Sequence, residues 1–419
     1  MPSVSVKLYS LFFKLILKRR LQNRIQNPNL TDDMTTSFGV TSRPEETIAA
    51  ANPSFTDGVA TKDIHIDPAS CLSIRIFLPD TCLASPDSVA ARVRTVGTKR
   101  SELGSRSFHR RNSYGSPETC NVVGSESNRR SSYSNGFSTG DLSVELENCA
   151  YRGYSPISKR CRKLPVMVQF HGGGFVAGSC DSVANDLFCR RIVKANLAEC
   201  GKSLGRKVDS RKADVQGHIA DAFGASLVEP WLAVHGDLSR CVLLGVSCGA
   251  NIADYVARKA VESGTLLNPL KVVAQVLMYP FFIGNAPTRS EIKLSNSYFF
   301  DKSMGILAWR LFLPEDEFNL DHPAANPLIP NRGGPPLKQM PPTLTVVAEH
   351  DWMRDRAIAY AQELKKVNVD APVLDYKDCV HEFATLDMLL RTPEAQACAE
   401  DIAIWVKKYI SLRGHEFSY

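Results

Sequence analysis

The chain has 419 residues, of which 44% are hydrophobic and 22% charged, and its formal net charge is +6. Such a chain has enough apolar material for a full core, and its length would allow two or three domains. The positive charge is concentrated in residues 1–27 and 83–163, and the remainder is acidic. The folded part therefore offers no basic face, and we expect no nucleic-acid partner.

The N-terminal segment has the pattern of an amphipathic helix, with the sequence SVKLYSLFFKLILKRRLQ. Its polar side comprises Lys7, Ser10, Lys14 and Lys18, and its apolar side comprises Leu8, Leu11, Phe12, Leu15 and Ile16. The apolar run is too short to span a bilayer, and the basic cluster follows it, which reverses the order of a secretory signal. We expect this helix to pack over the pocket of its own domain. The alternative is peripheral membrane contact through residues 4–20.

A β-hairpin and then a disordered insertion are predicted next. Residues 59–66 and 72–78 alternate apolar and polar side chains, which predicts a hairpin within segment 51–82. Residues 83–163 contain 16 serines and 14 Lys or Arg with little periodicity, which predicts disorder. The phrases RRNS and RRSS in this insertion make Ser113 and Ser131 candidate kinase sites. A solvated linker is the simpler interpretation.

Strands and helices alternate through the last segment, residues 164–419, which we expect to be the catalytic domain. Strands are predicted at 166–170, 241–247, 271–280, 343–350 and 372–377, and helices at 182–195, 218–234, 249–263, 355–366 and 391–411. This alternation predicts an α/β fold, in which a mostly parallel sheet carries helices on both faces. The 12 cysteines show no CxxC or Cys/His spacing, which indicates reduced thiols in the cytoplasm and no zinc site.

A nucleophile signature stands at the end of the predicted strand 241–247. The sequence GVSCG at 245–249 places Ser247 on a tight turn from a strand into a helix. Such a turn holds the serine Oγ clear of the sheet, and the flanking glycines remove side chains that would clash. A chance match or a plain tight turn is the alternative. The strand before the motif and the helix after it favour a nucleophile.

A serine nucleophile needs a base and an orienting acid. Asp351 follows the predicted strand 343–350 directly, and His381 lies just after the last predicted strand. The order Ser, Asp, His along the chain is the one expected for an α/β-hydrolase. Asp355 is the runner-up acid, although it lies a helical turn further on and suits capping better. His350 would point to the opposite side of an extended chain from Asp351, so we interpret it as structural.

The glycine-rich run HGGG at 171–174 can supply backbone N–H donors at the end of an earlier strand. A tetrahedral intermediate carries an oxyanion that such donors stabilise. We assign Gly173 and Gly174 to an oxyanion hole, together with the N–H of Cys248. A phosphate-binding loop is the competing use of glycine. However, no Lys-Ser/Thr pair follows the run, and the G-x-G-x-x-G spacing is absent. His171 is expected to brace the loop.

Taken together, the motifs HGGGF, GVSCGAN, HDWMRD and VHEF closely resemble the hormone-sensitive-lipase family of α/β-hydrolases, specifically its plant-type carboxylesterases. The resemblance covers residues 55–80 and 164–411. It implies a cap over the pocket, built from the helix within 1–50 and part of 281–340. It also implies hydrolysis of carboxylic esters with short to medium acyl chains, without a metal or organic cofactor. The gibberellin receptors of this family lack the catalytic His, so His381 argues for an enzyme.

The sequence departs from the family pattern at one place. After the helix that follows the HGGG loop, family members have a further strand, a segment similar to YRLAPE and another helix. Here no apolar, β-rich run occurs between residues 196 and 240. We therefore expect one central strand to be missing, between the second strand and the HGGG strand, as a skipped exon or a faulty gene model would cause. Its loss would expose two strand edges and much apolar surface.

Three functional interpretations follow. The first is a serine carboxylesterase that uses an acyl-enzyme intermediate, with Ser247 as nucleophile, His381 as general base and then acid, and Asp351 as orienting acid. The second is a catalytically impaired variant that binds small ligands or partners through its cap. The damaged sheet favours this second interpretation, and the complete triad opposes it. The third is a product that does not fold.

Overall fold

The structure is a computed structural model that describes residues 3–26, 47–67, 72–83, 163–200, 204–208, 229–330 and 332–411. The chain divides into two units, one formed by residues 1–83 with 150–419 and the other by residues 84–149. All described residues belong to the first unit. The candidate kinase sites Ser113 and Ser131, and nearly all of the predicted insertion 83–163, lie outside the described residues.

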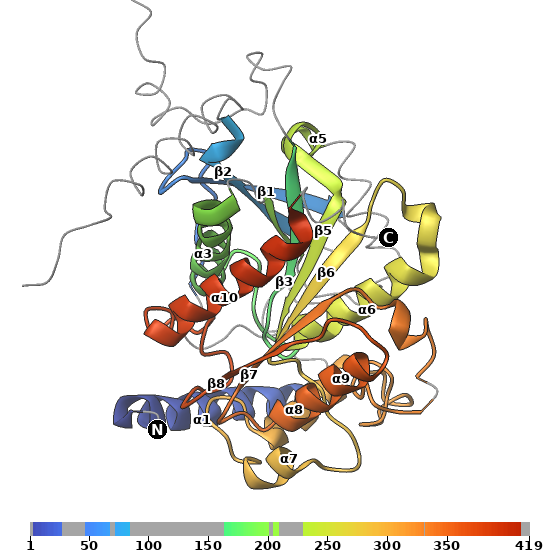
Figure 1. Cartoon of the computed structure of the whole chain (residues 1–419). Coiled ribbons are helices and arrows are strands. Elements are labelled where there is room, and N and C mark those ends of the chain that lie inside the picture. Colours follow the sequence, from blue (N-terminus) through green and yellow to red (C-terminus); the bar gives the residue numbers. More distant parts are fainter. Residues whose placement is uncertain are drawn as a thin grey trace, which may run out of the picture. The chain divides into compact units, whose positions relative to one another are not determined.

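The described residues form an eight-stranded sheet of order β1-β2-β4-β3-β5-β6-β7-β8 (Figure 1). The strands are β1 (Val59–Asp67), β2 (Leu72–Pro79), β3 (Leu164–Phe170), β4 (Leu204–Val208), β5 (Gly236–Val246), β6 (Val272–Met278), β7 (Thr343–Ala348) and β8 (Val373–Tyr376). The pairs β1–β2 and β2–β4 are antiparallel, and every further pair is parallel. The prediction of a mostly parallel sheet is therefore confirmed.

Helices cover both faces of this sheet (Figure 1). They are α1 (Val4–Gln26), α3 (Val183–Cys200), α5 (Pro230–His235), α6 (Cys248–Ser263), α7 (Arg289–Lys293), α8 (Lys302–Phe312), α9 (Arg354–Lys366) and α10 (Pro393–Ile410), with short 3-10 turns η1 (Asp80–Leu83), η3 (Gly264–Leu267) and η4 (Leu337–Gln339). Strand β5 shows how the two cores arise. Val242 and Leu244 join the core that includes α1, α3, α8 and α10, whereas Cys241 and Leu243 join the core that includes α6 and α9. Alternate side chains of a strand point to opposite faces, so both faces of β5 are buried.

The expectation that a central strand is missing is wrong. Strand β4 occupies the position between β2 and β3, where it pairs antiparallel with β2 and parallel with β3. Its sequence, LGRKV, has no apolar run, and this is why the pattern of side chains did not reveal it. Ladder hydrogen bonds are made by main-chain groups, which every residue except proline can supply in full. The segment thereby covers the two strand edges whose exposure we expected.

Helix α1 packs on the rest of the unit, but not through the apolar side that we expected to be buried. The opposite side of the helix is buried instead. The buried residues are Val6, Ser10, Phe13, Leu17 and Leu21. The ring of Phe13 meets the ring of Phe299 edge-on, with 5.9 Å between centroids. Leu8, Leu11, Phe12 and Leu15 instead face outward. Helix α1 thus has apolar side chains on two opposite sides, and the amphipathic prediction recognised one of them.

Polar contacts explain why the side of α1 that carries Ser10 is the buried one. The backbone N–H of Phe299 donates to Ser10 Oγ at 2.7 Å, and Lys14 Nζ lies 3.2 Å from Asp301 Oδ2. Burial alone would raise the pKa of Asp301. Hydrogen bonds from Ser303 and from the N–H of Met304, with the charge of Lys14, outweigh burial and hold the pKa of Asp301 below its usual range. Asp301 is therefore a carboxylate that can anchor α1.

Candidate active site

Ser247 lies at the turn where β5 ends and α6 begins. Its backbone has φ 53° and ψ −119°, and few residues other than glycine adopt a positive φ. The two flanking glycines make this turn sterically feasible. A Cβ on Gly245 would lie 2.2 Å from the backbone O of Gly249, and a Cβ on Gly249 would lie 2.3 Å from the O of Phe170. The turn therefore presents Ser247 beyond the end of the strand, as the motif predicts.

Three side chains from separate segments meet in one chain of hydrogen bonds. Ser247 Oγ lies 2.9 Å from His381 Nε2, and His381 Nδ1 lies 2.8 Å from Asp351 Oδ2. The other oxygen of Asp351 accepts the N–H of Met353 at 2.9 Å. The side chains of Ser247, His381 and Asp351 are all buried. They meet because Asp351 follows β7 and His381 follows β8, which is the next strand in the sheet.

The structure distinguishes Asp351 from the runner-up acid, because Asp351 contacts His381 and Asp355 contacts another residue. Asp355 Oδ2 accepts the N–H of Ser290 at 2.8 Å, so its carboxylate is engaged with α7. His350 donates its backbone N–H to the O of Cys379 at 2.9 Å, and its Nε2 lies 3.7 Å from Asp378 Oδ1. Asp355 thus joins α9 to α7, and His350 joins the ends of β7 and β8.

The HGGG loop follows β3 and turns sharply. Gly173 and Gly174 have φ values of 120° and 63°, and the N–H groups of Val176 and Ala177 donate to the O of Gly173 at 3.1 and 2.9 Å. Imidazole Nδ1 of His171 lies 2.7 Å from the O of Gly172, so the ring braces the loop itself. Cys248 is the first residue of α6, where the helix dipole is positive. The three assigned donors thus lie on the loop and the helix start that flank Ser247.

Two further ionisable side chains lie near the base. Burial raises the pKa of the Tyr279 phenol well above its usual range, and burial raises the pKa of the Cys379 thiol to about 12. The Tyr279 ring stands edge-on to the His381 imidazole, with 5.3 Å between centroids. Both groups are protonated near neutral pH. Neither can compete with His381 as a base.

Glu382 is a residue of this site that motif reasoning did not single out. It follows His381 directly, is buried and has φ 59°. Its Oε1 lies 2.3 Å from the place that a Cβ on Gly172 would take, so the carboxylate packs on the HGGG loop. The acid was visible in the motif VHEF, but only the fold shows that its side chain turns toward Gly172.

A small cavity lies at Ser247 and His381. Its volume is about 20 Å³, which is room for roughly one water molecule. Apolar side chains from distant parts of the chain form much of its wall, and these are Phe13, Leu17, Phe299, Phe300 and Leu386. Helix α1 therefore forms part of the roof of the site. A cavity of this volume has no room for an ester beside Ser247 unless its walls move.

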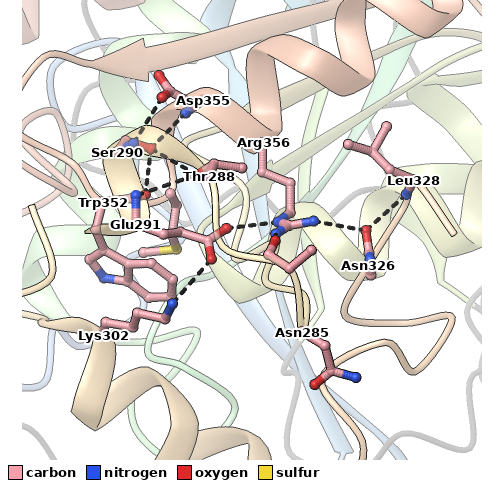
Figure 2. Close-up of polar contacts among 12 residues, drawn as sticks. Asn285, Thr288, Ser290, Glu291, Lys302, Asn326, Leu328, Trp352, Asp355 and Arg356 are labelled. Carbon is pink, nitrogen blue, oxygen red and sulfur yellow. Dashed lines mark hydrogen bonds and ion pairs between the residues drawn. The ribbon is translucent and has the colours of Figure 1, made fainter. Parts of the chain in front are cut away.

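The loop that carries Asp351 is fixed to α7 by hydrogen bonds (Figure 2). Ser290 Oγ donates to the O of Trp352 at 2.8 Å and accepts the N–H of Asp355 at 3.1 Å. Trp352 Nε1 donates in turn to the O of Phe300 at 2.9 Å. Ser290 thus ties the loop that carries Asp351 to α7, although its sequence context gave no sign of this.

A buried ion cluster lies beside that loop (Figure 2). Glu291 is fully buried, and its carboxylate lies 2.8 Å from Arg356 Nε and 3.3 Å from Lys302 Nζ. Arg356 Nη1 also donates to Asn326 Oδ1 at 3.2 Å. Glycine at 284 leaves room for this guanidinium, since a Cβ there would lie 2.6 Å from Arg356 Nη1. The cluster joins α7, α8 and α9.

Among the described residues, one group could bring three ligand atoms to a common metal ion. Glu349, His350 and Asp378 offer atoms that lie within 4.8 Å of one another. The N–H of Asp378 already donates to Glu349 Oε2 at 2.9 Å. We interpret the group as a polar cluster that joins the ends of β7 and β8. In the same described part of the chain, no helix is long and apolar enough to cross a bilayer.

The fold and the site are those of an α/β-hydrolase, and comparisons with known proteins agree. The profile of a family described as "alpha/beta hydrolase fold" matches residues 210–385. The crystal structure of a mutant of esterase rPPE has a TM-score of 0.51 and 19% identity, and covers 87% of this chain and 86% of that one. At this identity the likeness bears on the fold alone.

Relatives identify the family. "Probable carboxylesterase 16" and "Probable carboxylesterase 11" of Arabidopsis thaliana are each 62% identical, over 100% of this chain and 100% of their own. The chain therefore belongs to the plant carboxylesterases of the hormone-sensitive-lipase family. The first alignment spans 463 positions against 419 residues here, so at least 44 positions of that relative have no counterpart. The chain is thus shorter than this relative, although β4 fills the sheet.

Proposed function

We propose that this protein is a serine carboxylesterase that hydrolyses carboxylic esters of small to medium size in the cytoplasm. The observation that carries the proposal is the continuous chain Ser247–His381–Asp351, with links of 2.9 and 2.8 Å. The names of its Arabidopsis relatives support the reaction class. None of the six cysteines that the structure shows as buried forms a disulfide, which suits a reducing compartment.

The proposed reaction has two halves. Ser247 Oγ attacks the ester carbonyl while His381 Nε2 takes its proton, and the same imidazole then gives that proton to the leaving alkoxide. Asp351 holds the imidazolium through Nδ1–H. Water then attacks the acyl-enzyme with His381 as base, and the proton returns to Ser247 as the acid leaves. The N–H groups of Gly173, Gly174 and Cys248 stabilise both oxyanions.

The impaired-variant alternative is not favoured. It rested on a damaged sheet, and β4 completes the described sheet between β2 and β3. The apolar roof at the cavity suits an uncharged acyl group, while its small volume requires the roof to open for substrate. The proposal therefore combines an assembled triad with a small cavity that must widen for substrate.

Labelling with a fluorophosphonate probe tests the proposed nucleophile. The wild-type protein should be labelled and should hydrolyse p-nitrophenyl acetate, because the probe phosphonylates a serine that a base activates. Ser247→Ala should abolish labelling. Ser263→Ala, at the far end of α6, is the matched control and should label fully. Persistent labelling of Ser247→Ala, or a folded wild type that neither labels nor hydrolyses the ester, would refute the assignment.

Substitution of Gly173 tests the oxyanion loop. A Cβ there would lie 1.8 Å from the O of Ala177, at a φ that L residues rarely adopt. We expect Gly173→Ala to lower kcat for p-nitrophenyl acetate by about 10²–10³-fold, because the N–H donors are displaced. Gly264→Ala is the control, since Gly264 also has positive φ but has nothing within 4 Å of its Cβ position. Equal kinetics for the two variants would contradict the role of the loop.

A further inference from the structure

The outward side of α1 is a continuous apolar stripe that the fold does not use. Its members have exposed fractions between 58% and 72%, and they are Val4, Leu8, Leu11, Phe12 and Leu15. Their spacing of three and four residues places them on one side of the helix. Other large exposed hydrophobic residues in the described ranges, such as Leu187, Leu266 and Val367, belong to separate elements. The stripe is therefore a distinct surface, here called the outer stripe.

The outer stripe and the buried side of α1 lie on opposite sides of the helix. Phe13 and Leu17 point into the core and line the cavity at Ser247, whereas Leu8, Leu11 and Leu15 are exposed. Scattered single hydrophobic residues are normal on a protein surface, but five on one helix face mark an interaction site. A partner can thus cover the outer stripe while α1 stays in place as the roof.

Charge determines which partner fits. Helix α1 carries six basic residues and no acidic one. Lys14 is engaged with Asp301, while Lys7 and Arg19 are exposed beside the outer stripe. An apolar stripe with flanking Lys and Arg is the composition of a helix that lies in the interface of an anionic membrane. A second copy of the chain suits this surface poorly, because two such helices would bring like charges together without an acid between them.

We propose that the outer stripe of α1 docks this protein on the surface of an anionic lipid bilayer. The helix axis lies in the membrane plane, with the leucines in the acyl boundary and Lys7 and Arg19 at the headgroups. The buried side of α1 remains packed on the rest of the unit. This inference does not depend on ester hydrolysis. It would, however, place the roof of the catalytic site directly against the lipid.

Co-sedimentation of the full chain with vesicles tests the proposal. Binding should be strong to vesicles of phosphatidylcholine mixed with phosphatidylserine, weak to phosphatidylcholine alone, and reduced by salt. Leu11→Gln with Leu15→Gln should lower the partition coefficient at least about tenfold. Leu266→Gln is the matched control, since this leucine is 87% exposed but lies on η3. Lys7→Gln with Arg19→Gln should weaken binding to the anionic vesicles alone.

Thermal melting of each variant checks folding, because the changed side chains are exposed. Failure of the wild-type protein to bind anionic vesicles would overturn the proposal. Binding that is unchanged in the double leucine variant would overturn it as well. Light scattering tests the competing occupant, which is a second copy of the chain. A wild-type dimer that becomes a monomer in the Leu11→Gln, Leu15→Gln variant would assign the outer stripe to contact between copies and would overturn the proposal.

Discussion

Asp351→Asn should lower kcat for ester hydrolysis by about 10⁴-fold while leaving the protein folded. In the structure, Asp351 Oδ2 accepts from His381 Nδ1, so the proton-free Nε2 faces Ser247. An asparagine can present its N–H₂ to Nδ1 instead, which stabilises the tautomer with the proton on Nε2. That tautomer cannot take the proton of Ser247. Steady-state kinetics, with a thermal melt to verify folding, measure the effect.

The runner-up acid supplies the control for this experiment. Asp355→Asn removes one charge only four residues away, in the first turn of α9. Its carboxylate accepts from Ser290, so we expect the change in kcat to stay below about tenfold. A larger loss for Asp355→Asn than for Asp351→Asn would reverse the assignment of the acid.

Glu291→Ala should cause the largest loss of stability, about 3–5 kcal/mol of the free energy of unfolding. Glu291 is fully buried between Arg356 and Lys302, and its removal leaves the buried Arg356 guanidinium without its closest carboxylate. The variant also leaves a void where α7 meets the Asp351 loop. The midpoint of urea unfolding, together with an unchanged slope, measures the loss.

A surface ion pair provides the comparison. Glu262→Ala removes the partner of Lys259, which lies 2.8 Å away with both side chains about one third exposed. Such pairs contribute at most about 1 kcal/mol. If the two alanine variants unfolded at the same urea concentration, the buried cluster would not carry the stability that we assign to it. Glu291→Gln should fall between them, since it keeps the volume and one acceptor.

Local sequence determines some parts of the site directly. The contacts that require Gly245 are with Gly249 and Ala250, so this part of the nucleophile turn is encoded within a few residues. Gly249, in contrast, is required by its contact with the distant Phe170. The strands before Asp351 and His381 were recognisable from their apolar runs, and their adjacency follows from the order of strands in this fold. The structure brings these residues together, although their catalytic roles stay predictions until they are tested.

Other parts depend on distant contacts and were not readable. Strand β4 is held by main-chain pairing with β2 and β3. Such pairing does not depend on apolar side chains, so the polar sequence of β4 gave no sign of a strand. The side of α1 that packs inward is chosen by Phe299 and Asp301, which lie nearly three hundred residues away. Glu291 and Arg356 are likewise 65 residues apart. A single sequence shows the members of such pairs but not their contact.

The backbone of Ser247 has an implication for how stable this protein can become. A non-glycine residue at positive φ is strained by about 1–3 kcal/mol, and the surrounding fold must hold it there. Glycine would relieve that strain but would remove the nucleophile. Selection for a more robust fold and selection for turnover therefore act in opposite directions at this one residue.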